Sequence, residues 1–241
     1  MNLVIDRGNT QIKFGIFDQV KLMHFDSALF LDKRKVMELV QEYSIRQVIL
    51  SSVVKEQNDS LLKILHECIP SVMELTHESK LPFSWTYQSK STMGKDRLAA
   101  VAGGMAIYPH TNLLVIDAGT AITYEVVTAN QNYLGGNISP GLQMRFKALH
   151  HFTSKLPLLT PEDDTPMVGN DTDEAIRAGI QYGMLHEIEG LIQHLSDTYP
   201  SLKTVITGGD AEFFARKLKN PIFVHPNLVL IGLNRILENN A

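Results

Sequence analysis

Two stretches of the chain share one pattern: Leu3-Val4-Ile5-Asp6-Arg7-Gly8-Asn9-Thr10 and Leu114-Val115-Ile116-Asp117-Ala118-Gly119-Thr120-Ala121. Each begins with an apolar run that predicts a strand, continues with an aspartate, one further residue and a glycine, and leads into a second apolar run. A single Asp-x-Gly is expected by chance in a chain of 241 residues. Two copies, each between two predicted strands, indicate a duplicated structural unit.

The repeated pattern suits phosphate binding. An aspartate at the end of a strand directs its carboxylate toward a cleft, and the glycine lets the backbone approach a phosphate without an obstructing Cβ. Polar side chains and loop N–H groups supply donors, and Lys13 on the strand that leaves the first turn adds a positive charge. Two such turns facing each other would hold a polyphosphate, with the aspartates binding Mg²⁺ directly or through water. The alternative is that each aspartate only shapes a turn, but the repetition favours the functional interpretation.

A third segment completes the pattern expected for a nucleotide site. The apolar run that ends in Val205-Ile206 is followed by Thr207-Gly208-Gly209-Asp210 and a predicted helix over 211–218. Other nucleotide motifs are absent from the sequence: Gly94-Lys95 lacks the rest of a Walker A loop, and no G-x-G-x-x-G is present. Asp210 is interpreted equally well as a helix cap or as a nucleotide contact.

Composition limits the classes of partner. Hydrophobic residues make up 44% of the chain, charged residues 20%, and the net charge is −4 with both signs scattered. No basic block indicates a nucleic-acid partner. No apolar run reaches the ~20 residues that cross a bilayer, and the first residues do not resemble a secretory signal, so the cytoplasm is the expected location. One cysteine allows no internal disulfide.

Strand and helix patterns alternate along the chain, which predicts an α/β protein. The expected boundary lies near Thr111 and divides the chain into halves 1–111 and 112–241. The glycines and proline of 135–141 predict a loop, and Thr172–Tyr199 is the longest predicted helix, with Thr172 as its N-cap. The apolar face of that helix suits either core packing or a dimer interface.

The paired turns resemble the phosphate-1 and phosphate-2 loops of the superfamily that contains acetate kinase, sugar kinases, heat-shock chaperones and actin. The Gly208-Gly209 turn with its helix resembles the adenosine-binding element of that superfamily. The resemblance implies an α/β, duplicated actin-like ATPase (ribonuclease H-like) fold, in which the nucleotide binds in the cleft between two similar halves.

Further motifs resemble one family of this superfamily, the type III pantothenate kinases. They are the D-x-G-N-T-x-x-K opening from Asp6 to Lys13, the G-x-D-R motif Gly94–Arg97 with Tyr87 upstream, the G-G-x-I-x-P-G segment 135–141, the run 169–172, and Gly232-Leu233. Together they cover nearly the whole chain in the expected order. Arg7 and Lys95 occupy variable positions where apolar residues are more usual.

The family resemblance implies ATP-dependent phosphorylation of the primary hydroxyl of pantothenate, the first step toward coenzyme A. It implies Asp96 as general base, and substrate contacts from Tyr87, Gly94, Lys95, Asp96, Arg97 and Thr172. ATP contacts fall on Asp6, Arg7, Gly8, Asn9, Thr10, Gln11, Ile12, Lys13 and Thr120. Asp117 would bind a monovalent cation, K⁺ or NH₄⁺, and Asp6 would bind Mg²⁺ through water. The resemblance also implies a homodimer.

Alternatives remain at the level of sequence. Without the resemblance, Asp96-Arg97 is better interpreted as a helix start with a surface ion pair, and Tyr87 and Thr172 carry no independent signal. His186-Glu187 does not form an H-E-x-x-H metal motif. The rival functions are a kinase of the same superfamily with another small acceptor, and a non-catalytic nucleotide-binding accessory protein. Intact Asp96 and Arg97 argue against the second, and the short chain disfavours a structural role like that of actin.

Overall fold

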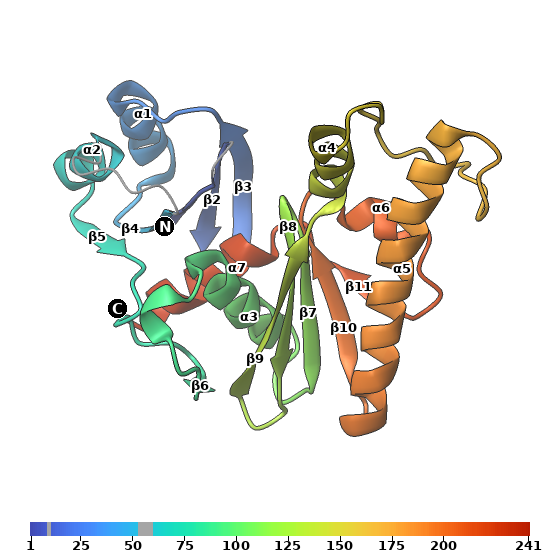
Figure 1. Ribbon diagram of the computed structural model, residues 1–241. Helices are drawn as coiled ribbons and strands as arrows, with labels where there is room; N and C mark the ends of the chain where they lie inside the picture. Colours follow the sequence, from blue (N-terminus) through green and yellow to red (C-terminus); the bar gives the residue numbers. More distant parts are fainter. Residues whose placement is uncertain (9–10, 53–59) are drawn as a thin grey trace. The chain divides into compact units, whose positions relative to one another are not determined.

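The computed structural model describes residues 1–8, 11–52 and 60–241, which form two compact units (Figure 1). The first unit consists of Met1–Pro109 together with Asn227–Ala241, and the second of His110–Pro226. The sequence predicts a boundary at Thr111 and assigns everything after it to the second half. Residues 227–241 instead belong to the first unit, because the helix that they form packs against a helix and strands of that unit.

The first unit contains a five-stranded sheet in the order β3-β2-β1-β4-β5. Strands β1 to β3 form an antiparallel meander, and β4 and β5 run parallel to β1. This arrangement confirms the two strands predicted on either side of the Asp6 turn and adds β3, which the sequence pattern did not reveal. Its elements are β1 (Asn2–Arg7), β2 (Ile12–Asp18), β3 (Lys21–Ala28), α1 (Lys33–Tyr43), β4 (Gln47–Ser52), α2 (Ser60–Cys68), β5 (Ser71–Glu74), β6 (Ser84–Trp85), the short 3₁₀ helix η1 (Lys90–Thr92), α3 (Lys95–Ile107) and α7 (Leu228–Glu238).

Alternation along β1 assigns its residues to two faces. Leu3 and Ile5 are buried in the cluster that α1 and α2 cover. Val4 and Asp6 point to the opposite face, where helices α3 and α7 lie. Asp6 therefore belongs to the same face of the sheet as the helix whose first turn holds Asp96.

Helices α3 and α7 pack side by side (Figure 1), and their contact is made of small residues. A Cβ added at Gly232 would lie 1.8 Å from the Ala99 carbonyl oxygen and 2.7 Å from the Gly103 nitrogen. Both neighbours are backbone atoms within a helix, so neither can move without disturbing α3.

The variant Gly232→Ala is expected to lower the free energy of unfolding by about 2–4 kcal/mol, because the helices must separate. Gly190→Ala is the matched control: Gly190 also lies inside a helix, but a Cβ there meets no atom within 4 Å. Alanine at that position is expected to stabilise by about 0.5–1 kcal/mol. Urea unfolding measures both changes, and equal effects at the two positions would contradict the proposed close contact.

The second unit repeats the plan of the first. Its strands run in the order β11-β10-β7-β8-β9, with β7 to β9 as an antiparallel meander and β10 and β11 parallel to β7. The topology confirms that the chain contains a duplicated unit. Its elements are β7 (Leu113–Ala118), β8 (Ala121–Val127), β9 (Asn132–Pro140), α4 (Leu142–Phe152), α5 (Thr172–Thr198), β10 (Lys203–Thr207), α6 (Ala211–Ala215) and β11 (Ile222–Val224).

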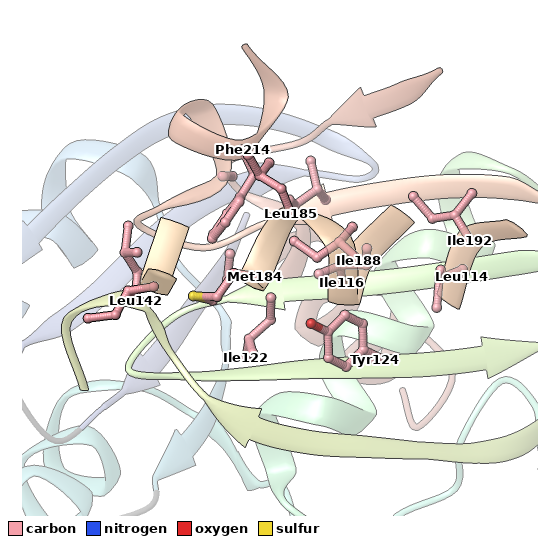
Figure 2. Packing of buried hydrophobic residues seen from close by; sticks show 14 of the residues in the cluster. Leu114, Ile116, Ile122, Tyr124, Leu142, Met184, Leu185, Ile188, Ile192 and Phe214 are labelled. Atoms are coloured by element: carbon pink, nitrogen blue, oxygen red, sulfur yellow. The ribbon is translucent and has the colours of Figure 1, made fainter. Parts of the chain in front are cut away.

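Helix α5 covers one face of this second sheet. Figure 2 shows Ile116, Ile122 and Tyr124 of the strands packed against Met184 and Ile188 of the helix. All five are buried. Asp117 alternates with Ile116 and therefore points to the sheet face opposite α5. No helix in the described part of the chain is long and apolar enough to span a membrane.

Three details differ from the sequence predictions. The segment 135–141, predicted as a loop, is largely strand β9; Gly136 is needed because a Cβ there would lie 1.9 Å from the Tyr124 carbonyl of the paired strand. Helix α4 was not predicted. The N-cap of α5 is Asp171 rather than Thr172: its carboxylate accepts from the Glu174 N–H at 2.8 Å, and the Glu174 carboxylate accepts from the Asn170 N–H.

Candidate functional site

Asp6 is the second-last residue of β1, the central strand of the first unit, and a polar residue lies opposite it on each neighbouring strand. It lies opposite Lys13 in the antiparallel pair with β2, and opposite Ser51 in the parallel pair with β4. Directly opposed residues have side chains on the same face of a sheet. Lys13, Asp6 and Ser51 therefore form a polar row across three strands.

The electrostatic environment of Asp6 disfavours its charge. Burial and, to a lesser extent, the negative charge of Asp96 raise the pKa of Asp6 to about 6. The ammonium of Lys13 acts in the opposite direction but does not compensate. The effect of Asp96 places its carboxylate near that of Asp6, although 90 residues separate them in sequence. This end of the unit therefore has more negative charge than its own lysine can balance.

Helix α3 presents the Gly94-Lys95-Asp96-Arg97 motif at its N-terminus. Gly94 is the N-cap residue, and Asp96 in the first turn accepts a hydrogen bond from the Arg97 N–H at 2.9 Å. The positive end of the helix favours a carboxylate there. A Cβ at Gly94 would lie 2.5 Å from Asp96 Oδ1, so the glycine leaves room for the carboxylate.

Arg97 and Tyr87 come together, as the sequence motif implied. The Arg97 guanidinium carbon lies 5.9 Å from the centre of the Tyr87 ring, and Arg97 is only 5% exposed. A buried arginine at the start of a helix is unlike the surface ion pair that the sequence alone favoured. The neighbouring Lys95 does form an ion pair: its ammonium lies 2.9 Å from the Glu74 carboxylate.

The first turn is described only in part. Arg7 pairs with Ile12 at the ends of the two strands, and the Gly8 N–H donates to the Gln11 carbonyl at 3.1 Å. Asn9 and Thr10, both predicted ATP contacts, lie outside the described residues.

Asp117 occupies the same place in the second unit. It lies opposite Thr123 in the pair with β8 and opposite Thr207 in the pair with β10. The polar row of the first unit is thus repeated, with threonines on both sides of the aspartate.

The turn that holds Thr120 is fixed by backbone hydrogen bonds from two other segments. The Gly141 N–H donates to the Thr120 carbonyl at 3.1 Å, and the Asp210 N–H donates to the Ala118 carbonyl at 3.0 Å. Gly208 permits the second contact: its φ is +97°, and a Cβ would lie 2.5 Å from the Ala118 carbonyl. The Thr207-Gly208-Gly209-Asp210 turn is therefore built onto the Asp117 turn.

Asp210 occupies the N-cap position of α6, but its side chain makes no capping hydrogen bond there. Burial raises the pKa of Asp210. The carboxylate is therefore not used as a cap, and the nucleotide contact stays a prediction.

Two buried hydroxyls beside the aspartates lack hydrogen-bond partners. Among the described residues, Ser51 Oγ and Thr123 Oγ1 are the buried side-chain polar atoms without one. Ser51 lies opposite Asp6, and its hydroxyl favours the Asp6 carboxylate, although by less than the ammonium of Lys13 does. Buried polar groups are normally satisfied. Because the two hydroxyls lie next to the repeated aspartates, we interpret their positions as places where ligand atoms, ions or water bind.

Thr172 lies at a separate place in the second unit. With Arg145 it lines a mainly apolar cavity of about 760 Å³ between α4 and α5. Nothing in the sequence singled out Arg145, because it lies in the helix that was not predicted. The sequence signal that could have found it is its position shortly after Pro140-Gly141.

Arg145 joins three elements of the second unit. Its Nε donates to the Pro140 carbonyl at 2.8 Å, and one terminal nitrogen donates to Ser139 Oγ at 2.9 Å and to Glu187 at 2.6 Å. The other Glu187 oxygen accepts from the Tyr124 hydroxyl at 2.8 Å. Burial raises the pKa of Glu187, but these hydrogen bonds outweigh it and the net shift is downward. The network fixes the residues just before Gly141, whose N–H meets Thr120.

Comparison with solved structures identifies the class of fold. A Campylobacter jejuni protein described as a Baf family transcriptional activator matches with a TM-score of 0.65 at 22% identity, over 99% of this chain and 98% of that one. A Sinorhizobium meliloti protein described as a 2-dehydro-3-deoxygalactonokinase matches with a TM-score of 0.56 at 11% identity, over 99% of each chain. Together with the duplicated sheets, they define an actin-like ATPase or sugar kinase fold.

Comparison of sequences gives the family. The family described as type III pantothenate kinase matches residues 2–194. Relatives with that name are 43% identical in Bacteroides fragilis strain YCH46 (100% of this chain, 98% of the relative) and 42% identical in Porphyromonas gingivalis strain W83 (100% and 99%). The chain belongs to the type III pantothenate kinase family.

Proposed function

We propose that this protein transfers the γ-phosphoryl group of ATP to the primary hydroxyl of pantothenate, in the biosynthesis of coenzyme A. Family membership over the whole chain carries this conclusion, and the duplicated fold supports it. The protein is accordingly a kinase, a phosphotransferase with an alcohol acceptor.

In the proposed reaction, Asp96 accepts the proton of the pantothenate hydroxyl. The oxygen attacks the γ-phosphorus, a new O–P bond forms, the bond to the β,γ-bridging oxygen breaks, and ADP leaves. A carboxylate is a weak base, but phosphoryl transfer depends mainly on orientation and charge stabilisation. The place of Asp96 in the first turn of α3, near Asp6, supports this role.

Acceptor binding is assigned to Arg97 with Tyr87, Gly94 and Lys95, and to Thr172. The guanidinium of Arg97 suits the pantothenate carboxylate or other substrate oxygens, and its contact with Tyr87 supports a preformed site. Lys95 contributes less, since Glu74 engages its ammonium. Thr172 has the support of the cavity that it lines with Arg145.

ATP is assigned to the two repeated turns: Asp6, Arg7, Gly8, Asn9, Thr10, Gln11, Ile12 and Lys13 in the first unit, and Thr120 in the second. The residues around Asp6 fit Mg²⁺, because the carboxylate of Asp96 lies near enough to that of Asp6 to disfavour its charge. The described residues contain no cluster of three or more metal-binding side chains, so Mg²⁺ would arrive with the ATP phosphates and bind Asp6 through water. When bound, it neutralises charge on the phosphates.

A monovalent cation, K⁺ or NH₄⁺, is assigned to Asp117. The threonine hydroxyls on both sides of this carboxylate supply oxygen atoms that fit such an ion. We also propose a cytoplasmic homodimer, for which the apolar residues exposed near α4 and α5, such as Phe152 and Val168, give support.

The test of the function is ATP-dependent phosphorylation of pantothenate by the purified protein, with Mg²⁺ and with or without K⁺. We expect phosphopantothenate to form from pantothenate, and we expect no phosphorylation of related hydroxy acids. ATP binding without turnover of any acceptor would instead indicate a nucleotide-binding accessory protein.

Replacement of Arg145 by methionine is expected to raise the KM for ATP about 10-fold, because the Thr120 turn loses its indirect support. The KM for pantothenate would then change by about 2-fold or less. Arg177→Met is the matched control: Arg177 also binds a backbone carbonyl and a glutamate, those of Thr160 and Glu162, without contact to the turn. A rise in the pantothenate KM alone would show that Arg145 acts on the acceptor cavity.

A further inference from the structure

The two units place different residues at one equivalent position. In the first unit, Lys13 lies directly opposite Asp6; in the second, Thr123 lies directly opposite Asp117. The pairs match in register, because the strand residues just before them also correspond: Ile5 pairs with Phe14, as Ile116 pairs with Tyr124. The turn between the paired strands is one residue longer in the first unit than in the second. Lys13 and Thr123 therefore do not align when the two sequence stretches are compared without a gap.

This difference changes the charge beside the aspartate. In the first unit, the ammonium of Lys13 lowers the pKa of Asp6 and so favours its carboxylate form. At the equivalent position in the second unit, β8 supplies only the uncharged hydroxyl of Thr123. Strand β8 therefore places no positive charge at the position where β2 places Lys13.

The hydroxyl of Thr123 is itself incompletely satisfied. Thr123 is 9% exposed, and its Oγ1 has no hydrogen-bond partner among the described residues. Leaving a buried hydroxyl unpaired destabilises the folded protein. Thr207, on the other side of Asp117, is different, because its hydroxyl donates to the Pro226 carbonyl at 3.5 Å. Of the two threonines, Thr123 is thus the one with an oxygen that lacks a partner.

We propose that Thr123 Oγ1 is a ligand of the monovalent cation at Asp117, and that this cation replaces the charge that Lys13 supplies in the first unit. A hydroxyl and a carboxylate are oxygen ligands of the kind that K⁺ accepts. The inference rests on the proposed function for the cation at Asp117. It adds the second ligand and explains why a monovalent cation would lie beside Asp117, where the equivalent position of the first unit holds Lys13.

The test compares Thr123→Val and Thr123→Ser with the unaltered protein. Thermal unfolding is measured in K⁺ and in tetramethylammonium at equal ionic strength, with and without Mg²⁺ and a non-hydrolysable ATP analogue. We expect K⁺ to raise the Tm of the unaltered protein and of the serine variant. The valine variant should need about 10-fold more K⁺ for the same rise, and without K⁺ it should be at least as stable as the unaltered protein, because its buried hydroxyl is gone.

A matched control and a reversed substitution strengthen the test. Thr204→Val removes another buried threonine hydroxyl of the same sheet, away from Asp117, and should leave the K⁺ response unchanged. Thr123→Lys restores the residue type of the first unit and should make both the Tm and the turnover of pantothenate independent of K⁺. The valine variant keeps the inference testable if the larger lysine prevents folding.

The outcomes separate this inference from the proposed function. A K⁺ response in Thr123→Val equal to that of the unaltered protein would show that the hydroxyl binds water or nothing, and would overturn the inference. Phosphorylation of pantothenate with no K⁺ effect on Tm or turnover would overturn it too, while the function stands. A K⁺ effect that is lost in the valine variant, in a protein that does not phosphorylate pantothenate, would support the cation site and reject the function.

Discussion

Replacement of Asp96 by asparagine is expected to lower kcat for pantothenate phosphorylation by about 10³-fold, within the range that general bases contribute. Asparagine has the same shape and can still accept the hydrogen bond from the Arg97 N–H, so α3 should begin in the same way. It cannot take a proton from the hydroxyl. The KM for ATP should change by about 3-fold or less, since the proposed ATP contacts lie elsewhere.

The control for this variant is Asp32→Asn. Asp32 caps α1 by accepting from the Lys35 N–H at 2.8 Å, and asparagine caps a helix about as well as aspartate. Steady-state kinetics should therefore find the control unchanged. A kcat for Asp96→Asn within about 10-fold of the unaltered enzyme would reduce Asp96 to a residue that orients the hydroxyl.

Replacement of Asp6 by asparagine is expected to remove activity and to stabilise the protein. Loss of the carboxylate proposed to hold Mg²⁺ through water should reduce kcat/KM by about 10²–10³-fold. Stability should change in the opposite direction, because the folded protein disfavours the Asp6 charge. Such opposition between function and stability is common at active sites.

The pH dependence of this stabilisation follows from the sign of the shift. The pKa of Asp6 rises from 3.8 to about 6 on folding, so below pH ~4 both states hold the proton and the charge costs nothing. As the pH rises through 4 to 6, the unfolded chain loses its proton more readily and the folded protein is destabilised. Two pKa units correspond to at most about 3 kcal/mol. Asp6→Asn removes this loss.

Urea unfolding without Mg²⁺ or nucleotide measures the effect. The variant should exceed the unaltered protein in stability at pH 7.5 and match it near pH 4. Asp18→Asn, at the exposed end of β2, is the control and should show neither change. A stabilisation that is independent of pH would mean that it does not come from removal of a buried charge at Asp6.

Most of the strand framework was predictable because its signals are local. Apolar runs that end at Asp6 and Asp117 gave the hairpins, and their repetition gave the duplicated fold. The strand β9 was missed because its glycines, which elsewhere mark loops, serve here to let two strands approach closely. Helix α4 was missed because it lies between a segment interpreted as a loop and a long helix.

The candidate site was predictable only in part. Motifs brought Asp96, Arg97 and Tyr87 to attention, but the proximity of Asp96 to Asp6 depends on packing between α3 and the sheet, which no local pattern encodes. Arg145 and Thr123 were not identified. Arg145 acts through contacts with distant residues, and an unsatisfied hydroxyl at Thr123 can be recognised only when its surroundings are known.

The route of the chain through the two units has a consequence for synthesis on the ribosome. The second unit is continuous in sequence, whereas the first consists of residues 1–109 and the returning segment 227–241. Domains tend to fold as they emerge, N-terminal first. Here the earlier-made unit must wait for its last helix, so the later-made unit can fold before it. Until α7 is made, the residues of α3 that it covers stay exposed, and exposed surface of that kind favours aggregation of a nascent chain.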